Sequence, residues 1–259
     1  MAGSQIERAL GILEQLAGAG EGLALQVLAD RLRIPKSAAH RMVSELVRLS
    51  YVRQDASTGR YRLSTRLIAL GFRQLAQIGA DVVQPILDRL AEDSGELVRL
   101  GVVEEGGLTW LAKSQGARSG LRYDPDMGRA APLFSTASGH AWLASMSDEK
   151  ALAMVAAQRE LIGDIETGPN APTDGAALLS CLAQARKQGY AWVSDSSAVG
   201  MAALAAVIHH PVQGHPLGVL SVAGPGARLS AARIETVAPA LVAACKELSE
   251  ASQASAFFA

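Results

Sequence analysis

The chain has 259 residues, of which 49% are hydrophobic and 19% charged, and its net charge is −1. This composition is typical of a globular protein long enough for two domains and excludes an intrinsically disordered chain. No apolar run approaches the roughly 18–20 residues of a membrane-spanning helix. Gln5, Glu7 and Arg8 also interrupt the apolar stretch that a signal peptide needs. We therefore expect a cytoplasmic protein with no membrane contact.

The charge is distributed unevenly along the chain. Residues 1–80 contain 11 Lys and Arg against 6 Asp and Glu, a net charge of +5, whereas residues 81–259 contain 13 against 19, a net charge of −6. A basic N-terminal part indicates a polyanionic partner such as nucleic acid. An ordinary solvated surface carries similar charge, so the asymmetry alone leaves both interpretations open.

Ser4-Gln5-Ile6-Glu7 matches the capping box that opens a helix, and Gly18-Ala19-Gly20 is a stop signal. Between them, one apolar stripe at helical spacing is formed by Ile6, Leu10, Leu13 and Ala17. We expect an amphipathic first helix.

Residues 25–42 match a helix-turn-helix. Ala29 supplies the small residue needed where the two helices cross, and the inner corner is filled by Leu28, Leu32, Ile34, Ala39 and Met42. Arg33 occupies the turn position where glycine is usual, and a left-handed conformation there costs about 1 kcal/mol. Pro35 ends the first helix and starts the second.

The second helix is expected from about Lys36 to Leu49. Its outer face near the N-terminus carries Lys36, Ser37, His40 and Arg41. Short polar and cationic side chains suit base edges and phosphates in a major groove, so these four are the candidate DNA contacts. A charged surface helix is the other interpretation, which the corner pattern makes less favourable.

Two short strands around Gly59, at residues 51–55 and 60–63, predict a hairpin directly after the recognition helix, which is a wing. Arg60 and Arg62 are candidate contacts to phosphate or a minor groove, or they solubilise an edge hairpin. A linker helix is expected at residues 65–80. We thus divide the chain into a DNA-binding domain (1–64), the linker helix, and a second domain (81–259).

The second domain mixes helix and strand patterns, which predicts an α+β sheet with helices on one or both faces. No Walker A loop, dinucleotide fingerprint, nucleophile elbow or paired-cysteine motif is present, so we expect no catalysis and no cofactor. His209, His210 and His215 are interpreted as turn residues rather than metal ligands. Cys181 and Cys245 are interpreted as reduced core residues.

The order and spacing of several short segments resemble the IclR family of transcriptional regulators over nearly the whole chain. These segments are Arg8-Ala9-Leu10, Ile34-Pro35-Lys36-Ser37, Gly59-Arg60-Tyr61-Arg62-Leu63, Ala131-Pro132-Leu133, Thr136-Ala137-Ser138-Gly139, Gly189-Tyr190-Ala191 and Ser221-Val222-Ala223-Gly224-Pro225. The resemblance implies a winged helix-turn-helix, a linker helix and a GAF-like effector-binding domain, in a homodimer or homotetramer that binds operator DNA.

The resemblance also implies an effector pocket. Transferred to this sequence, its residues are Gly128, Phe134, Ser138, Asp195, Ala203, Ser221 and Ala223. The amide groups that open a helix near Thr136 would suit an anion, and Ser138 and Ser221 would add hydroxyls. Relatives often have histidine where this chain has Phe134 and lysine where it has His140, and Asp195 remains from a more acidic segment. The more apolar pocket favours a larger or aromatic ligand.

The sequence therefore predicts a ligand-responsive repressor of a catabolic operon, controlled by a small carboxylate or aromatic acid. Three other functions stay open: an activator of such an operon, a constitutive DNA-binding protein whose second domain only oligomerises, and an enzyme with an appended DNA-binding domain. The missing catalytic motifs make the last one the least favourable.

Overall fold

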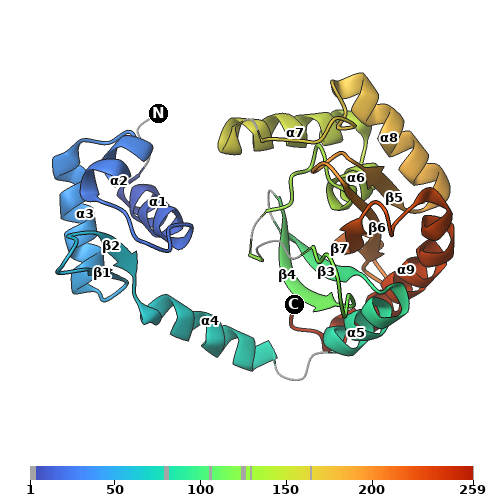
Figure 1. Cartoon of the computed structure of the whole chain (residues 1–259), viewed down its shortest axis with the longest axis horizontal. Coiled ribbons are helices and arrows are strands. Elements are labelled where there is room, and N and C mark those ends of the chain that lie inside the picture. Colours follow the sequence, from blue (N-terminus) through green and yellow to red (C-terminus); the bar gives the residue numbers. More distant parts are fainter. Residues whose placement is uncertain are drawn as a thin grey trace. The chain divides into compact units, whose positions relative to one another are not determined.

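The computed structural model describes residues 4–78, 82–104, 107–123, 127–128, 130–163 and 165–258. The chain divides into two compact units, Met1–Gly79 and Ala80–Ala259 (Figure 1). The boundary expected between residues 80 and 81 lies outside the described residues. In the described part of the chain, no helix combines the length and the apolar composition that crossing a bilayer requires.

The N-terminal unit is a winged helix-turn-helix followed by a further helix. Its elements are α1 (Gln5–Ala17), α2 (Leu25–Arg31), α3 (Lys36–Arg48), β1 (Val52–Gln54), β2 (Tyr61–Leu63) and α4 (Thr65–Ile78). The capping box is confirmed: the Ser4 hydroxyl accepts from the Glu7 amide at 3.1 Å, and the Glu7 carboxylate accepts from the Ser4 amide. Helix α1 ends at Gly18.

The apolar stripe expected on α1 is only partly buried. Ile12 and Leu16 face the core of this unit, whereas Ile6 is 72% and Leu10 53% exposed. Helix α1 carries apolar residues on two adjacent sides. Packing against α3 and β2 selected the side of Ile12.

The C-terminal unit is built on an antiparallel sheet in the order β4-β3-β7-β6-β5, with helices on both faces (Figure 1). The strands are β3 (Leu97–Glu104), β4 (Gly107–Gln115), β5 (Ala191–Ser194), β6 (Met201–His209) and β7 (Pro216–Pro225). The helices are α5 (Val83–Ser94), α6 (Ala137–Ala144), α7 (Asp148–Ile162), α8 (Gly175–Gln188) and α9 (Ala231–Ala251), and a 3-10 turn follows at Ser252–Ala254. The predicted α+β fold class is confirmed.

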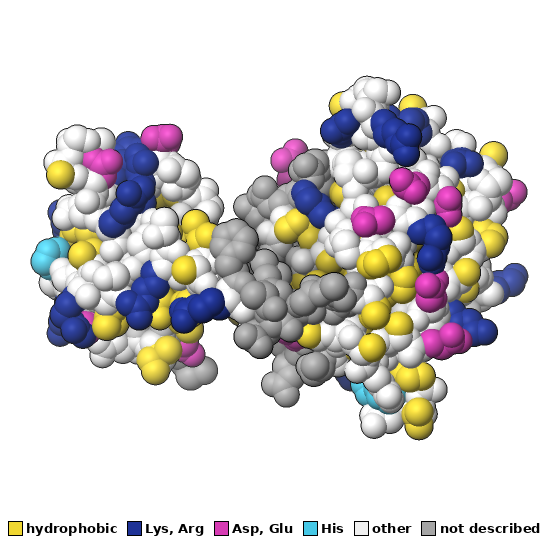
Figure 2. Space-filling view, turned by 90° about the horizontal axis from the view of Figure 1, so that it is seen from below, with side chains coloured by type: hydrophobic (Ala, Val, Ile, Leu, Met, Phe, Trp, Pro, Cys, Tyr) yellow, Lys and Arg dark blue, Asp and Glu magenta, His cyan; other side chains and the backbone are white. Residues whose placement is uncertain are grey.

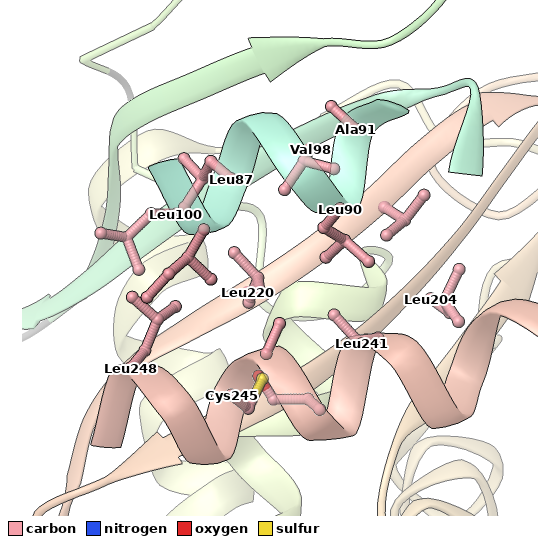
Figure 3. Packing of buried hydrophobic residues seen from close by; sticks show 14 of the residues in the cluster. Leu87, Leu90, Ala91, Val98, Leu100, Leu204, Leu220, Leu241, Cys245 and Leu248 are labelled. Carbon is pink, nitrogen blue, oxygen red and sulfur yellow. The ribbon is translucent and has the colours of Figure 1, made fainter. Parts of the chain in front are cut away.

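Two apolar cores lie on opposite faces of this sheet. On one face, side chains from α5, α9 and the strands pack together, among them Leu87, Leu220 and Leu241 (Figure 3). On the other face, α6 lies against β6 and β7, and α8 packs on α6 and β5. Because side chains alternate along a strand, Leu220 and Val222 point to α5 and α9. Their neighbour Ser221 therefore points to the α6 side.

The two cysteines differ in their surroundings. Cys245 lies on the buried side of α9 (Figure 3), where burial raises the pKa of its thiol to about 12. Cys181 is exposed, so the expectation of a core position was wrong for this residue. Helix α8 buries Leu178, Leu182 and Ala185 instead, and Cys181 lies beside that stripe.

Candidate DNA-binding surface and effector cavity

Helix α3 presents its polar side to solvent at its N-terminal end. The helix begins after Pro35, and its inner side, Ala39, Met42, Val43 and Leu46, is buried. The four predicted contact residues, Lys36, Ser37, His40 and Arg41, are all exposed. Figure 2 shows Lys and Arg side chains over much of one face of the N-terminal unit. The arrangement suits contact with a polyanion along the first turns of α3.

The turn between α2 and α3 has a left-handed residue at the position where glycine is usual. Arg33 has φ of +52°, and the Ile34 amide donates to the Ala29 carbonyl at 3.0 Å across the turn. Crowding of Cβ against the backbone makes this conformation costly for any residue except glycine. The strain is maintained by the buried contacts of α2 with α3, which hold the recognition helix at its angle.

We expect Arg33→Gly to raise the free energy of unfolding of the N-terminal unit by about 1 kcal/mol, because glycine relieves the left-handed strain. Arg33→Ala removes the same charge but keeps Cβ, so it should bring no such gain. Hydrogen exchange of peptides from residues 5–48 in the full chain measures the difference. Equal protection in the two variants would contradict the strain argument.

The wing is the hairpin of β1 and β2, paired from Val52–Leu63 to Gln54–Tyr61. The Asp55 carboxylate holds its turn by accepting from the Ser57 hydroxyl and the Ser57 and Thr58 amides, and these bonds lower the pKa of Asp55 to about 2. The turn is therefore fixed at neutral pH, with Arg60 exposed beside it.

Arg62 differs from Arg60 in its setting. It is half-buried, and its guanidinium lies 3.5 Å from the Glu21 carboxylate. A methyl group at Gly22 would lie 2.6 Å from Arg62 Cγ, so the side chain packs closely on that turn. Arg62 thus joins the wing to the segment between α1 and α2, while Arg60 stays free to reach outward.

The C-terminal unit contains a small, largely enclosed cavity between the sheet and the start of α6. Its volume is about 30 Å³, which holds roughly one water molecule. The cavity is lined by Arg99, Trp110, Tyr123, Thr136, Ala137, Ser138, Ser197, Met201, Ala202, Ala203, Ser221 and Ala223. Four of the seven predicted effector residues, Ser138, Ala203, Ser221 and Ala223, meet there.

The other three predicted residues lie outside the cavity wall. Gly128 donates its amide to the Trp110 carbonyl at 2.9 Å. Phe134 packs with the Arg159 guanidinium 4.0 Å above its ring. Asp195, with φ of +52°, accepts from the Gly200 amide and shapes the turn before β6. Each supports a neighbouring segment of the wall rather than the cavity surface itself.

The start of α6 is held by close backbone packing. The Thr136 hydroxyl accepts from the Gly139 amide at 3.0 Å and caps the helix. A methyl group at Gly139 would lie 2.3 Å from the Leu133 carbonyl oxygen, so only glycine allows this approach. His140 Nε2 lies 2.7 Å from the Phe134 carbonyl, and burial lowers the pKa of the imidazole. A neutral His140 that donates this bond ties the same loop to α6.

Arg99 is the main residue of the cavity that sequence reasoning missed. It lies on β3 opposite Ser221 of β7, and its guanidinium stacks 3.8 Å from the centre of the Trp110 ring. A signal was present in the sequence, because Arg99 interrupts the apolar run Leu97–Val102 of a strand expected in the core. A charge inside such a run indicates a buried function or partner.

Models of two domains match nearly the whole chain. The helix-turn-helix domain of IclR matches residues 5–56, and the C-terminal domain of the bacterial transcriptional regulator IclR matches residues 77–250. The chain belongs to the IclR family. The family consists of transcriptional regulators, so this member is a DNA-binding regulator and not an enzyme.

Individual IclR-family relatives are similar over almost the full length. The acetate operon repressor of Salmonella typhimurium is 28% identical over 246 residues, which are 94% of this chain and 88% of the relative. A crystal structure of an IclR regulator from Silicibacter has a TM-score of 0.77 at 25% identity and covers 95% of both chains. An IclR homologue of Microbacterium hydrocarbonoxydans, crystallised with 4-hydroxybenzoate, has a TM-score of 0.73 at 24% identity and covers 97% of this chain and all of the homologue.

Proposed function

We propose that this IclR-family member is a repressor of a catabolic operon, acting in the cytoplasm as a homodimer or homotetramer that a small carboxylate or aromatic acid releases from DNA. One observation carries the proposal. The same chain joins an exposed basic helix in a winged helix-turn-helix to a domain with a closed cavity at a helix N-terminus.

On the DNA side, α3 is the element that fits a major groove. Lys36, Ser37, His40 and Arg41 would contact base edges and phosphates, and Arg60 would contact the backbone from the wing. Arg62 takes part chiefly by holding the wing through Glu21. Two copies of α3 in a dimer would read half-sites about 34 Å apart, one turn of the duplex.

Exposed apolar side chains support an assembly of more than one copy. Ile6 and Leu10 of α1 and Ile68 of α4 lie on the surface of the N-terminal unit. A contiguous exposed apolar patch often marks a contact surface between proteins, and Ile6 and Leu10 are one helical turn apart on α1. A second copy of the chain is the occupant that the proposed near-palindromic operator requires.

On the effector side, the cavity supplies groups that suit an anion. Ala137 and Ser138 lie in the first turn of α6, where amide groups have no partner within the helix. Ser138 and Ser221 add hydroxyls, and Ala203 and Ala223 leave space. Gly128, Phe134 and Asp195 would shape the wall from behind. The 4-hydroxybenzoate in the Microbacterium homologue supports an aromatic acid as one ligand class.

Effector control requires two states with different affinity for the ligand. The cavity of about 30 Å³ is far smaller than the roughly 300 Å³ or more of typical ligand pockets, so binding of an effector here would require a more open state. A ligand that binds an opened state better would shift the population toward it, and operator affinity would change by the same coupling free energy.

We expect the double variant Lys36→Ala/Arg41→Ala to lose about 10- to 100-fold in operator affinity and to flatten the salt dependence by about one unit of slope for each phosphate contact removed. Fluorescence anisotropy measures both on a near-palindromic duplex enriched from a random pool. Lys187→Ala, an exposed lysine of α8, is the matched control and should bind like the wild type. Unchanged affinity of the double variant would place the DNA contact elsewhere.

The repressor function has its own test. Small carboxylates, aromatic acids and sugar acids are titrated into the preformed complex of full-length protein and duplex. Repression is supported if the bound protein lowers transcription from the duplex and one chemical class then releases the protein from the DNA. Higher transcription by bound protein would make it an activator. Operator affinity that no metabolite changes would make it a constitutive DNA-binding protein.

A further inference from the structure

Arg99 is a buried cation that lacks a polar partner on two of its nitrogens. The residue is 5% exposed, and no described residue accepts a hydrogen bond from its Nε or Nη1. Aromatic rings are its near neighbours, Trp110 at 3.8 Å and Tyr123 at 5.6 Å from the guanidinium carbon. Cation–π contacts compensate only part of the hydration that burial removes. Binding of an anion next to Arg99 should therefore be favourable, because the anion would supply the missing hydrogen-bond acceptor.

The guanidinium remains charged in this setting. Burial is the main influence and lowers the pKa of Arg99, whereas the nearby Tyr123 side chain raises it. Arginine starts from a pKa above about 12, so a lowered value still leaves it protonated at neutral pH. His140 of α6 points to the Phe134 carbonyl and has a lowered pKa. Arg99 is thus the cation that faces the cavity.

The remaining cavity wall complements a negative charge and opposes a positive one. No Asp or Glu is among the residues that line it in the described chain. Trp110 Nε1 is a second buried donor without a described partner, and Ser138 lies in the first turn of α6. Donors and a positive charge converge with no acceptor carboxylate, which is the pattern expected around an anionic ligand.

The shape of the wall favours a flat ring beside the charge. Trp110 and Tyr123 contribute aromatic side chains to the wall, and Ala137, Ala203 and Ala223 bring only methyl groups to the space between sheet and helix. Of the two rings, Trp110 is buried and Tyr123 half-exposed, so Tyr123 is the group that can yield. Displacing it would enlarge the closed cavity next to Arg99.

We propose that Arg99 determines effector specificity: its guanidinium pairs with the carboxylate of a small ring-bearing acid that rests against Trp110. This inference depends on the proposed function, because it assigns the chemistry of the same cavity. It adds a requirement that the function alone does not impose, namely that an uncharged ligand of the same shape is rejected.

The test compares acids with matched amides on full-length protein by isothermal titration. Benzoate and 4-hydroxybenzoate are paired with benzamide and 4-hydroxybenzamide, which keep the ring and lose the charge. Wild-type protein should bind at least one acid about 100-fold more tightly than its amide. Arg99→Met should bring the two within about threefold, and Arg99→Lys should fall between.

Folding of the variants is followed by thermal unfolding without ligand. Arg99→Met should melt at or above the wild-type temperature, because it removes an isolated buried charge and keeps the contact with Trp110. If Arg99→Met does not fold, Arg99→Gln takes its place in the same titrations.

Three results would overturn the inference. An Arg99→Met protein that keeps the preference for acid over amide would show that other groups recognise the charge, and effector binding itself would stand. Wild-type protein that binds neither acid, or binds the amides equally well, would also overturn it. The titration of the operator complex with other small carboxylates and sugar acids then decides separately whether the proposed function survives.

Discussion

Arg228→Met is expected to lower the free energy of unfolding of the C-terminal unit by about 3 kcal/mol, because it leaves a buried carboxylate without its partner. The Glu96 side chain is 4% exposed, and Arg228 donates to its two oxygens at 2.5 and 2.8 Å. The Arg228 side chain is itself 39% exposed, so the loss should fall at the lower end of the range for buried pairs. Urea unfolding measures it.

Tryptophan fluorescence is a selective readout for this experiment. Trp110, Trp142 and Trp192 all belong to the C-terminal unit, so the signal follows that unit in the full chain. The double variant Glu96→Gln/Arg228→Met should recover most of the loss, because neither charge remains.

A surface pair provides the matched control. Arg89→Met breaks the ion pair with Glu247, in which both side chains are about half exposed, and should cost less than 1 kcal/mol. If Arg228→Met lowers the free energy of unfolding no more than Arg89→Met does, the Glu96 carboxylate is hydrated in the variant. The prediction of an uncompensated buried charge would then be wrong.

The Arg228 variant should also strengthen effector binding. Arg228 donates to the Leu121 carbonyl at 3.0 Å, two residues before Tyr123 of the cavity wall. The pair with Glu96 therefore anchors the segment that carries Tyr123 to the sheet. Losing that anchor should let Tyr123 move aside more easily and raise acid affinity severalfold, while the preference for acid over amide, which Arg99 sets, is kept.

Gly139→Ala is expected to destabilise the C-terminal unit by about 3 kcal/mol, because the added methyl group has no room. It would lie 2.3 Å from the carbonyl oxygen and 2.4 Å from Cα of Leu133, and backbone atoms yield less readily than a flexible side chain. Either α6 or the loop at Leu133 must shift, which moves the amides of Ala137 and Ser138. Acid binding should therefore fall together with stability.

Gly71→Ala is the matched substitution in a helix with open space. Among the described residues, no atom outside the backbone of α4 itself lies within 4 Å of a Cβ at Gly71, so alanine should raise helix stability by up to about 1 kcal/mol. Calorimetry of both variants shows whether each substitution raises or lowers the unfolding temperature. A Gly139→Ala protein as stable as the wild type would mean that the loop adapts freely and does not position α6.

Local patterns carried much of the fold. The capping box at Ser4 and the corner residues Leu28 and Ala39 could be inferred from the sequence, because each depends on residues a few positions apart. The sequence left the conformation of Arg33 open, and the structure shows it to be left-handed. The family resemblance, which relates positions far apart in the sequence, named four residues that line the cavity: Ser138, Ala203, Ser221 and Ala223. Their common place around one cavity could not be obtained from spacing.

The position of Arg99 in the cavity was decided only by the tertiary structure, through pairing between distant strands. Arg99 meets Ser221, 122 residues later, because β3 and β7 pair in a register that also turns Arg99 toward α6. A one-residue slip would have turned Arg99 to the opposite core, and no local pattern specifies that register. Likewise, the side of α1 that became buried depended on what α3 and β2 presented to it. The sequence by itself determined the elements and the kind of protein, whereas the contacts between strands determined which charge faces the cavity.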